Sequence, residues 1–224
     1  MKYVYPSMIV LSLIVNVIVV LIISRKFKYT VDDLVSMLVM ENIGIIGGGI
    51  LYTYIFSKEL GFSSLGGVIG GLIMLYLYSL LVKKDYKYML ILFMPSIPLM
   101  YAIGKIGCFV AGCCYGIPYD GIGHIVYHSS EVALLNTNLF PIQIVETIIF
   151  LIIFVYIISR YYKNKFSIKL IMIEIIVCGI AKFLLDFLRY EHTVKLITSN
   201  QIMCLLLVIF SSIYLIRLNK KIKG

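Results

Sequence analysis

The stretch from Ile168 to Arg189, IKLIMIEIIVCGIAKFLLDFLR, is long and mostly apolar, yet it carries charged residues along its length. About 20 predominantly apolar residues are enough to cross the hydrocarbon core of a bilayer as a helix. A charge at that depth is costly, so it usually faces a protein interior and serves a function. We therefore expect a transmembrane helix whose polar residues Lys182, Asp186 and Arg189 mark a functional site.

The rest of the chain repeats this pattern of long apolar runs. Hydrophobic residues make up 61% of the sequence and its mean hydropathy is +1.01, values that indicate an integral membrane protein. We expect an all-α protein with seven transmembrane helices, forming a single domain over residues 1–224 with an outer loop at 117–138. The predicted spans are about 6–24, 34–56, 62–82, 88–116, 139–159, 168–188 and 199–216. The first run is expected to be a retained helix and not a signal peptide, because Arg25 and Lys26 follow it without a small-residue cleavage site.

Basic residues gather after every second run, and this asymmetry predicts the orientation. Of the 20 lysine and arginine residues, 14 follow the first, third, fifth and seventh runs. Because cytoplasmic loops are rich in Lys and Arg, the N-terminus is expected outside and the C-terminus inside. The net charge of +9 follows from this distribution, which suits the anionic inner leaflet, so we expect no nucleic-acid partner.

In this orientation the charged residues within the runs lie in the outer half of the bilayer. Lys182, Asp186 and Arg189 are spaced i, i+4, i+7 and therefore share one helix face. Two cations around a carboxylate are suited to holding a phosphate-bearing headgroup. The alternative is a salt-bridge ladder in which Arg189 extends to the membrane surface.

A second polar strip opens the fifth run, in the motif Pro141-x-Gln143-x-x-Glu146. Proline fits the first turn of a helix, and Gln143 and Glu146 then lie on one face. Glu146 could act as a general base or as an orienting carboxylate. It could equally form a buried pair with Lys105 or Lys182, and the residues alone leave these roles open.

The most distinctive motif is GKIGCFVAGCCYG at residues 104–116. Its glycines permit sharp turns and a close approach of backbone or lipid, and Lys105 offers a cation to a phosphate. The cysteines Cys108, Cys113 and Cys114 have three interpretations, namely apolar packing, a reactive thiol, and a disulfide or metal site. A bridge between Cys108 and Cys113 would require a break in the helix.

His124 and His128 lie at i, i+4 in the predicted outer loop. They could supply an acid or a base near the site. A zinc site is not expected, because no CxxC pair accompanies the two histidines. We expect neither a metal nor a cofactor.

Together these motifs resemble the prolipoprotein diacylglyceryl transferase family of bacterial membrane enzymes, over most of the chain. The resemblance rests on the seven runs with the N-terminus outside, on Gln201 at the start of the last run, and on several motifs. The motifs are Gly47-Gly48-Gly49, Gly66-Gly67-x-x-Gly70, the 104–116 signature, Pro141-x-Gln143-x-x-Glu146 and Lys182-x-x-x-Asp186-x-x-Arg189. The chain departs from the family pattern at six positions. It has Lys105 and Lys182 where the pattern has arginine, and Cys113 and Asp186 where the pattern has glutamate. Cys108 stands in place of asparagine and Leu65 in place of histidine.

The resemblance implies a transferase that moves a diacylglyceryl group from phosphatidylglycerol to an extracytoplasmic acceptor, in the family the lipobox cysteine of a prolipoprotein. It also implies the bacterial cytoplasmic membrane, with the active site toward the outer side. The expected catalytic residues are Lys105, Glu146, Lys182, Asp186 and Arg189. A thiol role is assigned to Cys108, Cys113 and Cys114, and substrate binding to Gly66, Gly67, Gly107, Gly116 and Gln143.

Two alternatives stay open at this point. One is a related lipid transferase whose acceptor is a sugar, polymer or lipid instead of a lipoprotein. The other is a non-catalytic lipid-binding or transport protein, which would need a polar path across the whole bilayer. Glu41, Asn42 and Glu174 are the candidates for the inner section of such a path.

Overall fold

The computed structural model describes residues 4–27, 29–58, 60–130, 132–164 and 167–223, and the chain divides into two compact units. Unit 1 consists of Met1–Ile14 with Pro98–Gly224, and unit 2 of Val15–Ile97. Within the described ranges every regular element is a helix and none is a β-strand, which confirms the all-α prediction. The helices in chain order are α1 (Val4–Ser24), α2 (Val31–Ser57), α3 (Ser64–Val82), α4 (Tyr86–Phe93), η1 (Met94–Ser96), α5 (Ile97–Ala111), α6 (Ile142–Asn164), α7 (Ile168–Asp186), η2 (Tyr190–Thr193) and α8 (Ser199–Lys223).

Six helical stretches in the described part of the chain are long and apolar enough to cross a membrane. They are Val4–Ser24, Val31–Ser57, Ser64–Val82, Tyr86–Ala111, Ile142–Lys163 and Ser199–Lys220. Helix α7 coincides with the predicted span 168–188, but it carries four charged residues, Lys169, Glu174, Lys182 and Asp186, which is more than the six candidate stretches contain over their apolar windows. The count of seven spans and the orientation of the termini therefore stay predictions.

The predicted span 88–116 is shorter and less regular in the structure than a single helix. It consists of α4, the 3-10 turn η1 and α5, and the helix ends at Ala111. Pro95 lies in η1, and Pro98 in the first turn of α5. Because proline lacks a backbone N–H, it interrupts the helical hydrogen-bond ladder at this point.

In unit 2, α2 and α3 pack together through glycines that bring the two backbones close. A Cβ atom on Gly48 would lie 2.5 Å from the carbonyl oxygen of Gly66, and one on Gly66 would also meet this neighbouring helix. Small residues at such crossings are typical of helices that pack inside a membrane. These glycines therefore serve close helix packing in unit 2.

Glu41, one candidate for a polar path, is buried in unit 2 and held by hydrogen bonds. The Asn16 side-chain amide donates to Glu41 Oε2 at 2.7 Å, and the Ser96 hydroxyl donates to Asn16 Oδ1 at 2.7 Å. These bonds tie α1, α2 and η1 together. They give Glu41 a structural role, since a buried carboxyl group is costly unless it is hydrogen-bonded.

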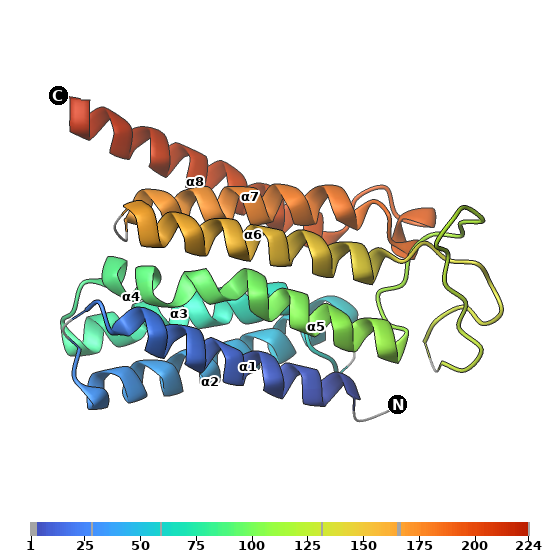
Figure 1. Cartoon of the computed structure of the whole chain (residues 1–224), viewed down its shortest axis with the longest axis horizontal. Coiled ribbons are helices and arrows are strands. Elements are labelled where there is room, and N and C mark those ends of the chain that lie inside the picture. The colour runs from blue at the N-terminus through green and yellow to red at the C-terminus, as the bar shows by residue number, and fades with distance from the viewer. Residues whose placement is uncertain (1–3, 28, 59, 131, 165–166, 224) are drawn as a thin grey trace. The chain divides into compact units, whose positions relative to one another are not determined.

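In unit 1 the end of α5, the start of α6 and the end of α7 lie close together. Helix α7 packs between α6 and α8, as Figure 1 shows. The segment after α5 pairs with the segment after α7, because the Ile117 N–H donates to Leu188 O and the Tyr190 N–H to Tyr115 O, each at 3.1 Å. The Phe140 N–H in turn donates to Ile117 O at 2.9 Å just before α6 begins. Polar residues near these ends can therefore meet.

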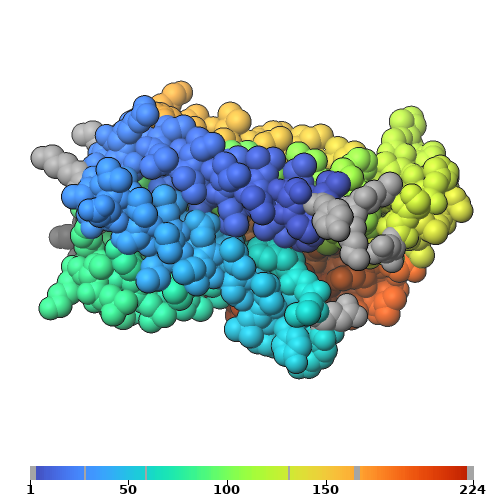
Figure 2. Space-filling view, turned by 90° about the horizontal axis from the view of Figure 1, so that it is seen from below, coloured from blue at the N-terminus to red at the C-terminus, as the bar shows by residue number. Residues whose placement is uncertain are grey.

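The connection between α5 and α6, predicted as an outer loop at 117–138, has ordered contacts of its own. Leu139 is fully buried and pairs with Pro118 and Ile125 through isolated β-bridges. In the space-filling view of Figure 2, this connection (yellow-green) lies beside the residues that follow α7 (orange-red). It covers the same end of unit 1 at which the helix ends gather.

Candidate active site

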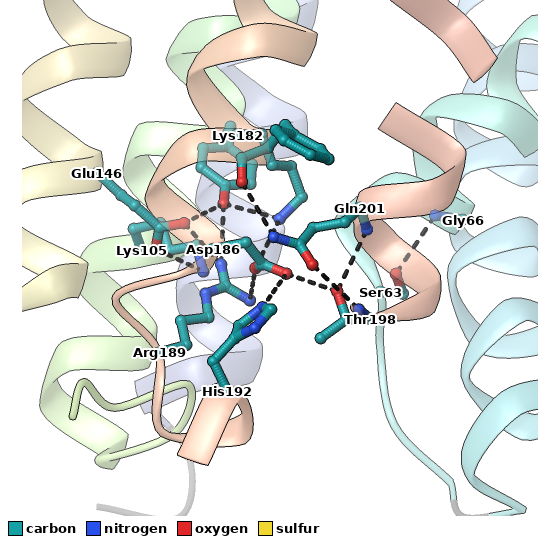
Figure 3. A network of polar contacts seen from close by, with 12 residues as sticks. Ser63, Gly66, Lys105, Glu146, Lys182, Asp186, Arg189, His192, Thr198 and Gln201 are labelled. Carbon is teal, nitrogen blue, oxygen red and sulfur yellow. Dashed lines mark hydrogen bonds and ion pairs between the residues drawn. The ribbon is translucent and has the colours of Figure 1, made fainter. Parts of the chain in front are cut away.

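Four segments of unit 1 supply the charged side chains of one buried network (Figure 3). Lys105 comes from α5, Glu146 from α6, Lys182 and Asp186 from α7, and Arg189 from the residues just after α7. None of these five side chains is more than a tenth exposed. The three cations therefore lie together in one network.

Glu146 holds two of the three cations. Its Oε2 atom lies 2.9 Å from the Lys105 ammonium, and its Oε1 atom lies 2.6 Å from Nη2 of Arg189. The alternative pairing of Glu146 with Lys105 is therefore present in the structure. Because each oxygen faces a cation, Glu146 holds Lys105 of α5 and Arg189, which follows α7, at one place.

Asp186 forms the second anchor. Its Oδ1 atom lies 3.1 Å from Nη1 of Arg189 and 3.9 Å from the Lys182 ammonium. The i, i+4 and i, i+3 spacings that the sequence shows place these partners on the same face. Burial alone would lower the pKa of the Arg189 guanidinium, but Glu146 and neighbouring groups, Asp186 among them, outweigh it and hold that pKa above its ordinary value.

Tyr101 links the two parts of the network. Its hydroxyl donates to Glu146 Oε1 at 2.7 Å and accepts from Lys182 Nζ at 3.3 Å and from Arg189 Nη2 at 3.2 Å. The ring packs on Phe150 with centroids 4.2 Å apart, within the apolar core of unit 1. Tyr101 was not among the predicted site residues, although its i, i+4 spacing from Lys105 places it on the same helix face.

The start of α8 closes the network around Asp186. Thr198 donates its hydroxyl proton to Asp186 Oδ2 at 2.7 Å. The same hydroxyl accepts from the Gln201 N–H at 3.2 Å, and the Gln201 side chain accepts from the Thr198 N–H at 3.0 Å. This is the reciprocal capping box of a helix N-terminus. Thr198 was missed by sequence reasoning, although Thr-x-x-Gln before an apolar run is its signal.

The network has one more positive than negative charge. Three cations face two carboxylates, and His192 Nε2 lies 3.9 Å from Asp186 Oδ2 without a hydrogen bond. The Nε atom of Arg189 is also buried and has no hydrogen-bond partner among the described residues. A buried donor without a partner is costly. This arrangement is therefore suited to an anion.

The cysteines of the 104–116 motif meet at the end of α5. The Sγ atoms of Cys108, Cys113 and Cys114 all lie within 4.8 Å of one another. Hydrogen bonds from Cys108 and Cys113, together with the positive charges of Lys105 and Arg189, lower the pKa of the Cys114 thiol. The break in the helix that a contact between Cys108 and Cys113 requires is present, because α5 ends at Ala111.

The residues predicted to bind substrate occupy several places. Gln143 donates to the Cys113 carbonyl oxygen at 3.0 Å, so it supports the cysteine turn. Gly107 packs closely on Met8 of α1, and Gly116 pairs with Arg189 through a β-bridge. Gly66 and Gly67 lie at the start of α3 in unit 2, where they pack against α2. Their role in substrate binding stays a prediction.

His124 and His128 of the outer loop take no part in the described network. The ring of His124 contacts the Gly121 carbonyl oxygen at 3.1 Å, and the ring of His128 contacts Asn136 Oδ1 at 3.0 Å. Both contacts are exposed and local to the loop. An acid or base role for these two histidines stays a prediction.

Comparison with known proteins connects this chain to one family. A sequence model described as prolipoprotein diacylglyceryl transferase matches residues 3–217. A phosphatidylglycerol–prolipoprotein diacylglyceryl transferase of Clostridium tetani is 31% identical over 222 residues, which cover 92% of this chain and 89% of that protein. A second enzyme of that name, from Clostridium perfringens, is 29% identical over 99% of this chain and 92% of its own length. A Dehalococcoides mccartyi relative of the same name is 35% identical over 43% of this chain and 37% of its own length.

Proposed function

The chain belongs to the prolipoprotein diacylglyceryl transferase family, and we propose that it transfers the diacylglyceryl group of phosphatidylglycerol to the cysteine thiol of a prolipoprotein. In this reaction the acceptor sulfur forms a bond to the glycerol carbon that carries the phosphate. The carbon–oxygen bond to the phosphate breaks, and glycerol phosphate leaves with its electron pair. The thiol proton is released to a base or to water.

The observation that carries this proposal is the excess positive charge of the buried network. Negative charge develops on the phosphate oxygen as the carbon–oxygen bond breaks, and preorganised cations stabilise it most where water is excluded. Lys105, Lys182 and Arg189 supply these cations, and all three are buried. Glu146 and Asp186 hold the cations in place without neutralising all of their charge.

Lys182 and Arg189 are the groups best placed to contact the phosphate. Lys182 has the longest ion pair of the three cations, 3.9 Å to Asp186, and its hydrogen bond to Tyr101 is 3.3 Å long. It can therefore turn toward an anion with little loss. Arg189 contributes its unpartnered Nε donor while Glu146 and Asp186 fix the rest of the guanidinium.

We place the enzyme in the bacterial cytoplasmic membrane with this site toward the outer side. The distribution of basic residues between alternate loops supports this orientation. The ends of α5 and α7 and the starts of α6 and α8 would then face the side on which a secreted acceptor arrives. The donor lipid would enter from the surrounding bilayer.

The proposal is tested by reconstitution. Purified protein in liposomes is incubated with phosphatidylglycerol labelled in its head group and with a lipobox peptide. Release of labelled glycerol phosphate and a diacylglyceryl mass increase on the peptide are both expected. A peptide with serine in place of cysteine is the control, and it should remain unmodified. No release with the cysteine peptide would overturn the proposal.

A pair of variants on α7 links activity to the site. Lys182→Met removes one charge-assisted contact to the phosphate, and a contact of this kind corresponds to roughly 10–100-fold in turnover. Lys169→Met removes a lysine from the other end of the same helix and should leave turnover near the wild-type value. Equal losses in the two variants would contradict the assignment of Lys182.

A further inference from the structure

The end of α5 folds the chain back so that three thiols meet. The Gly112 N–H donates to the Phe109 carbonyl at 3.3 Å, and the Cys113 N–H donates to the Cys108 carbonyl at 3.0 Å. Gly112 has a φ of +75°. This pair of bonds around a left-handed residue is a Schellman motif, which brings the residue after the glycine back over the last turn of the helix. Cys113 therefore lies beside Cys108.

The third thiol reaches the same place through a rare backbone conformation. Cys114 has a φ of +53°, in the left-handed region that L-residues other than glycine seldom adopt. Such conformations persist where the surroundings hold them, and they occur often at functional sites. The side chain of Gln143 on α6 holds the preceding turn through its bond to the Cys113 carbonyl. The arrangement is fixed from two helices.

The spacing of the three sulfur atoms suits a metal ion. With Zn–S bonds of about 2.3 Å, tetrahedral thiolate ligands lie about 3.8 Å apart. The three Sγ atoms all lie within 4.8 Å of one another, so no pair is more than about 1 Å beyond that distance. Thiolates are the ligands that soft and borderline metals such as zinc prefer.

We propose that Cys108, Cys113 and Cys114 bind one Zn²⁺ ion and that the acceptor cysteine occupies its fourth coordination position. Three protein ligands leave one tetrahedral position open, as in catalytic zinc sites. Cys108 is buried and Cys114 is exposed, so the open position can face an incoming peptide. This second part rests on the proposed function, because it needs a thiol acceptor.

The zinc ion would deprotonate the acceptor. The peptide thiol displaces a water molecule from Zn²⁺ and loses its proton to solvent, because a thiol that coordinates zinc is bound as thiolate. The zinc-bound sulfur then forms the bond to the glycerol carbon while glycerol phosphate leaves toward the cations. The thioether product is a weak ligand, and water replaces it on the metal. Activation of the acceptor would then depend on Cys108 and Cys113, the two positions of the motif at which the chain departs from asparagine and glutamate.

The metal site is tested first, without turnover. The reduced full-length protein is stripped with a chelator, titrated with Zn²⁺, and examined by native mass spectrometry. One zinc per chain is expected, and Cys108→Ser, Cys113→Ser or Cys114→Ser should each weaken binding by at least about 100-fold, since even supporting groups around metal ligands contribute up to that factor. Cys178→Ser and Cys204→Ser are matched controls and should bind zinc normally. No zinc uptake, or a disulfide that forms in its place, would overturn the site.

The acceptor position is tested with Co²⁺ in place of Zn²⁺. A lipobox peptide added without donor lipid should strengthen the sulfur-to-cobalt charge-transfer absorption, and a serine peptide should leave it unchanged. An unchanged spectrum with the cysteine peptide would overturn the acceptor role. Full diacylglyceryl transfer by the zinc-free protein would also overturn the acceptor role, but it would leave the proposed function intact. Metal binding and peptide coordination without transfer would leave this site standing and count against the proposed function.

Discussion

The Tyr101 hydroxyl and the Glu146 carboxylate are joined by a 2.7 Å hydrogen bond at the centre of the cation network. The oxygen that accepts this bond also binds Arg189 at 2.6 Å, and the Tyr101 hydroxyl accepts from Lys182. The bond therefore couples the cation on α7 to the carboxylate on α6. It makes Tyr101 a positioning residue for the proposed phosphate site.

Tyr101→Phe should reduce turnover while the protein still folds. The ring contact with Phe150 remains, but the hydroxyl that holds Lys182 and Arg189 is lost. A hydrogen bond to a charged group contributes about 1.5–3 kcal/mol, so we expect a loss of roughly 10-fold or more in kcat/KM. Steady-state kinetics across donor concentrations, with thermal unfolding in detergent as the control, would measure it. Wild-type kinetics would contradict the positioning role.

Glu146→Gln should destabilise the protein strongly. The side chain keeps its shape but loses its charge, and Lys105 and Arg189 then lack a buried partner. Breaking a buried ion pair from one side costs about 3–5 kcal/mol. The double variant Glu146→Gln with Lys105→Met removes one of the orphaned cations and should regain part of that stability. Additive losses of stability in the double variant would argue against this coupling.

Helical spacing and charge distribution were enough to predict the cation network. The i, i+4 and i, i+3 relations of Lys182, Asp186 and Arg189 are local. A charged side chain within a membrane-spanning run usually faces the protein interior, where it meets the other charged side chains. The cysteine cluster could not be predicted in this way. It depends on where α5 ends, which is set by the left-handed Gly112 and not by hydrophobic periodicity.

The same limit applies to residues that act through tertiary contacts. The sequence does not distinguish Tyr101 from an ordinary aromatic core residue. Only the approach of α6 and α7 gives its hydroxyl three charged neighbours. The apolar run at 88–116 was also predicted as one span, and the structure divides it into α4, η1 and α5, although Pro95 and Pro98 are visible in the sequence. Apolar length was the stronger signal, and it concealed the break.

Thr198→Val should weaken both the start of α8 and the position of Asp186. The hydroxyl is the N-cap acceptor for Gln201 and a donor to Asp186. Loss of an N-cap costs about 1 kcal/mol, which thermal unfolding can detect. Thr198→Ser keeps the hydroxyl and should restore both stability and turnover. If the serine variant behaves like the valine variant, the effect comes from packing and not from the hydrogen bonds.

Two adjacent glycines in unit 2 should respond oppositely to the same substitution. A Cβ on Gly48 would meet the backbone of α3 at 2.5 Å, whereas a Cβ on Gly47 would have no atom within 4 Å. Gly48→Ala must therefore push α2 and α3 apart, and we expect a loss of about 1–3 kcal/mol from overpacking. Gly47→Ala should be neutral or slightly stabilising, because alanine is the better helix former. Equal thermal stability of the two variants would contradict the close crossing.

The orientation of the chain predicts which loops a membrane-impermeant reagent can reach. Cysteines are introduced singly into a chain whose five native cysteines are replaced by serine. Ile122→Cys, in the fully exposed part of the predicted outer loop, should react with an impermeant maleimide in intact cells. Lys87→Cys lies among the basic residues that follow the third run, and it should react only after the membrane is permeabilised. The reverse pattern would place the cation network on the cytoplasmic side, where a secreted acceptor could not reach it.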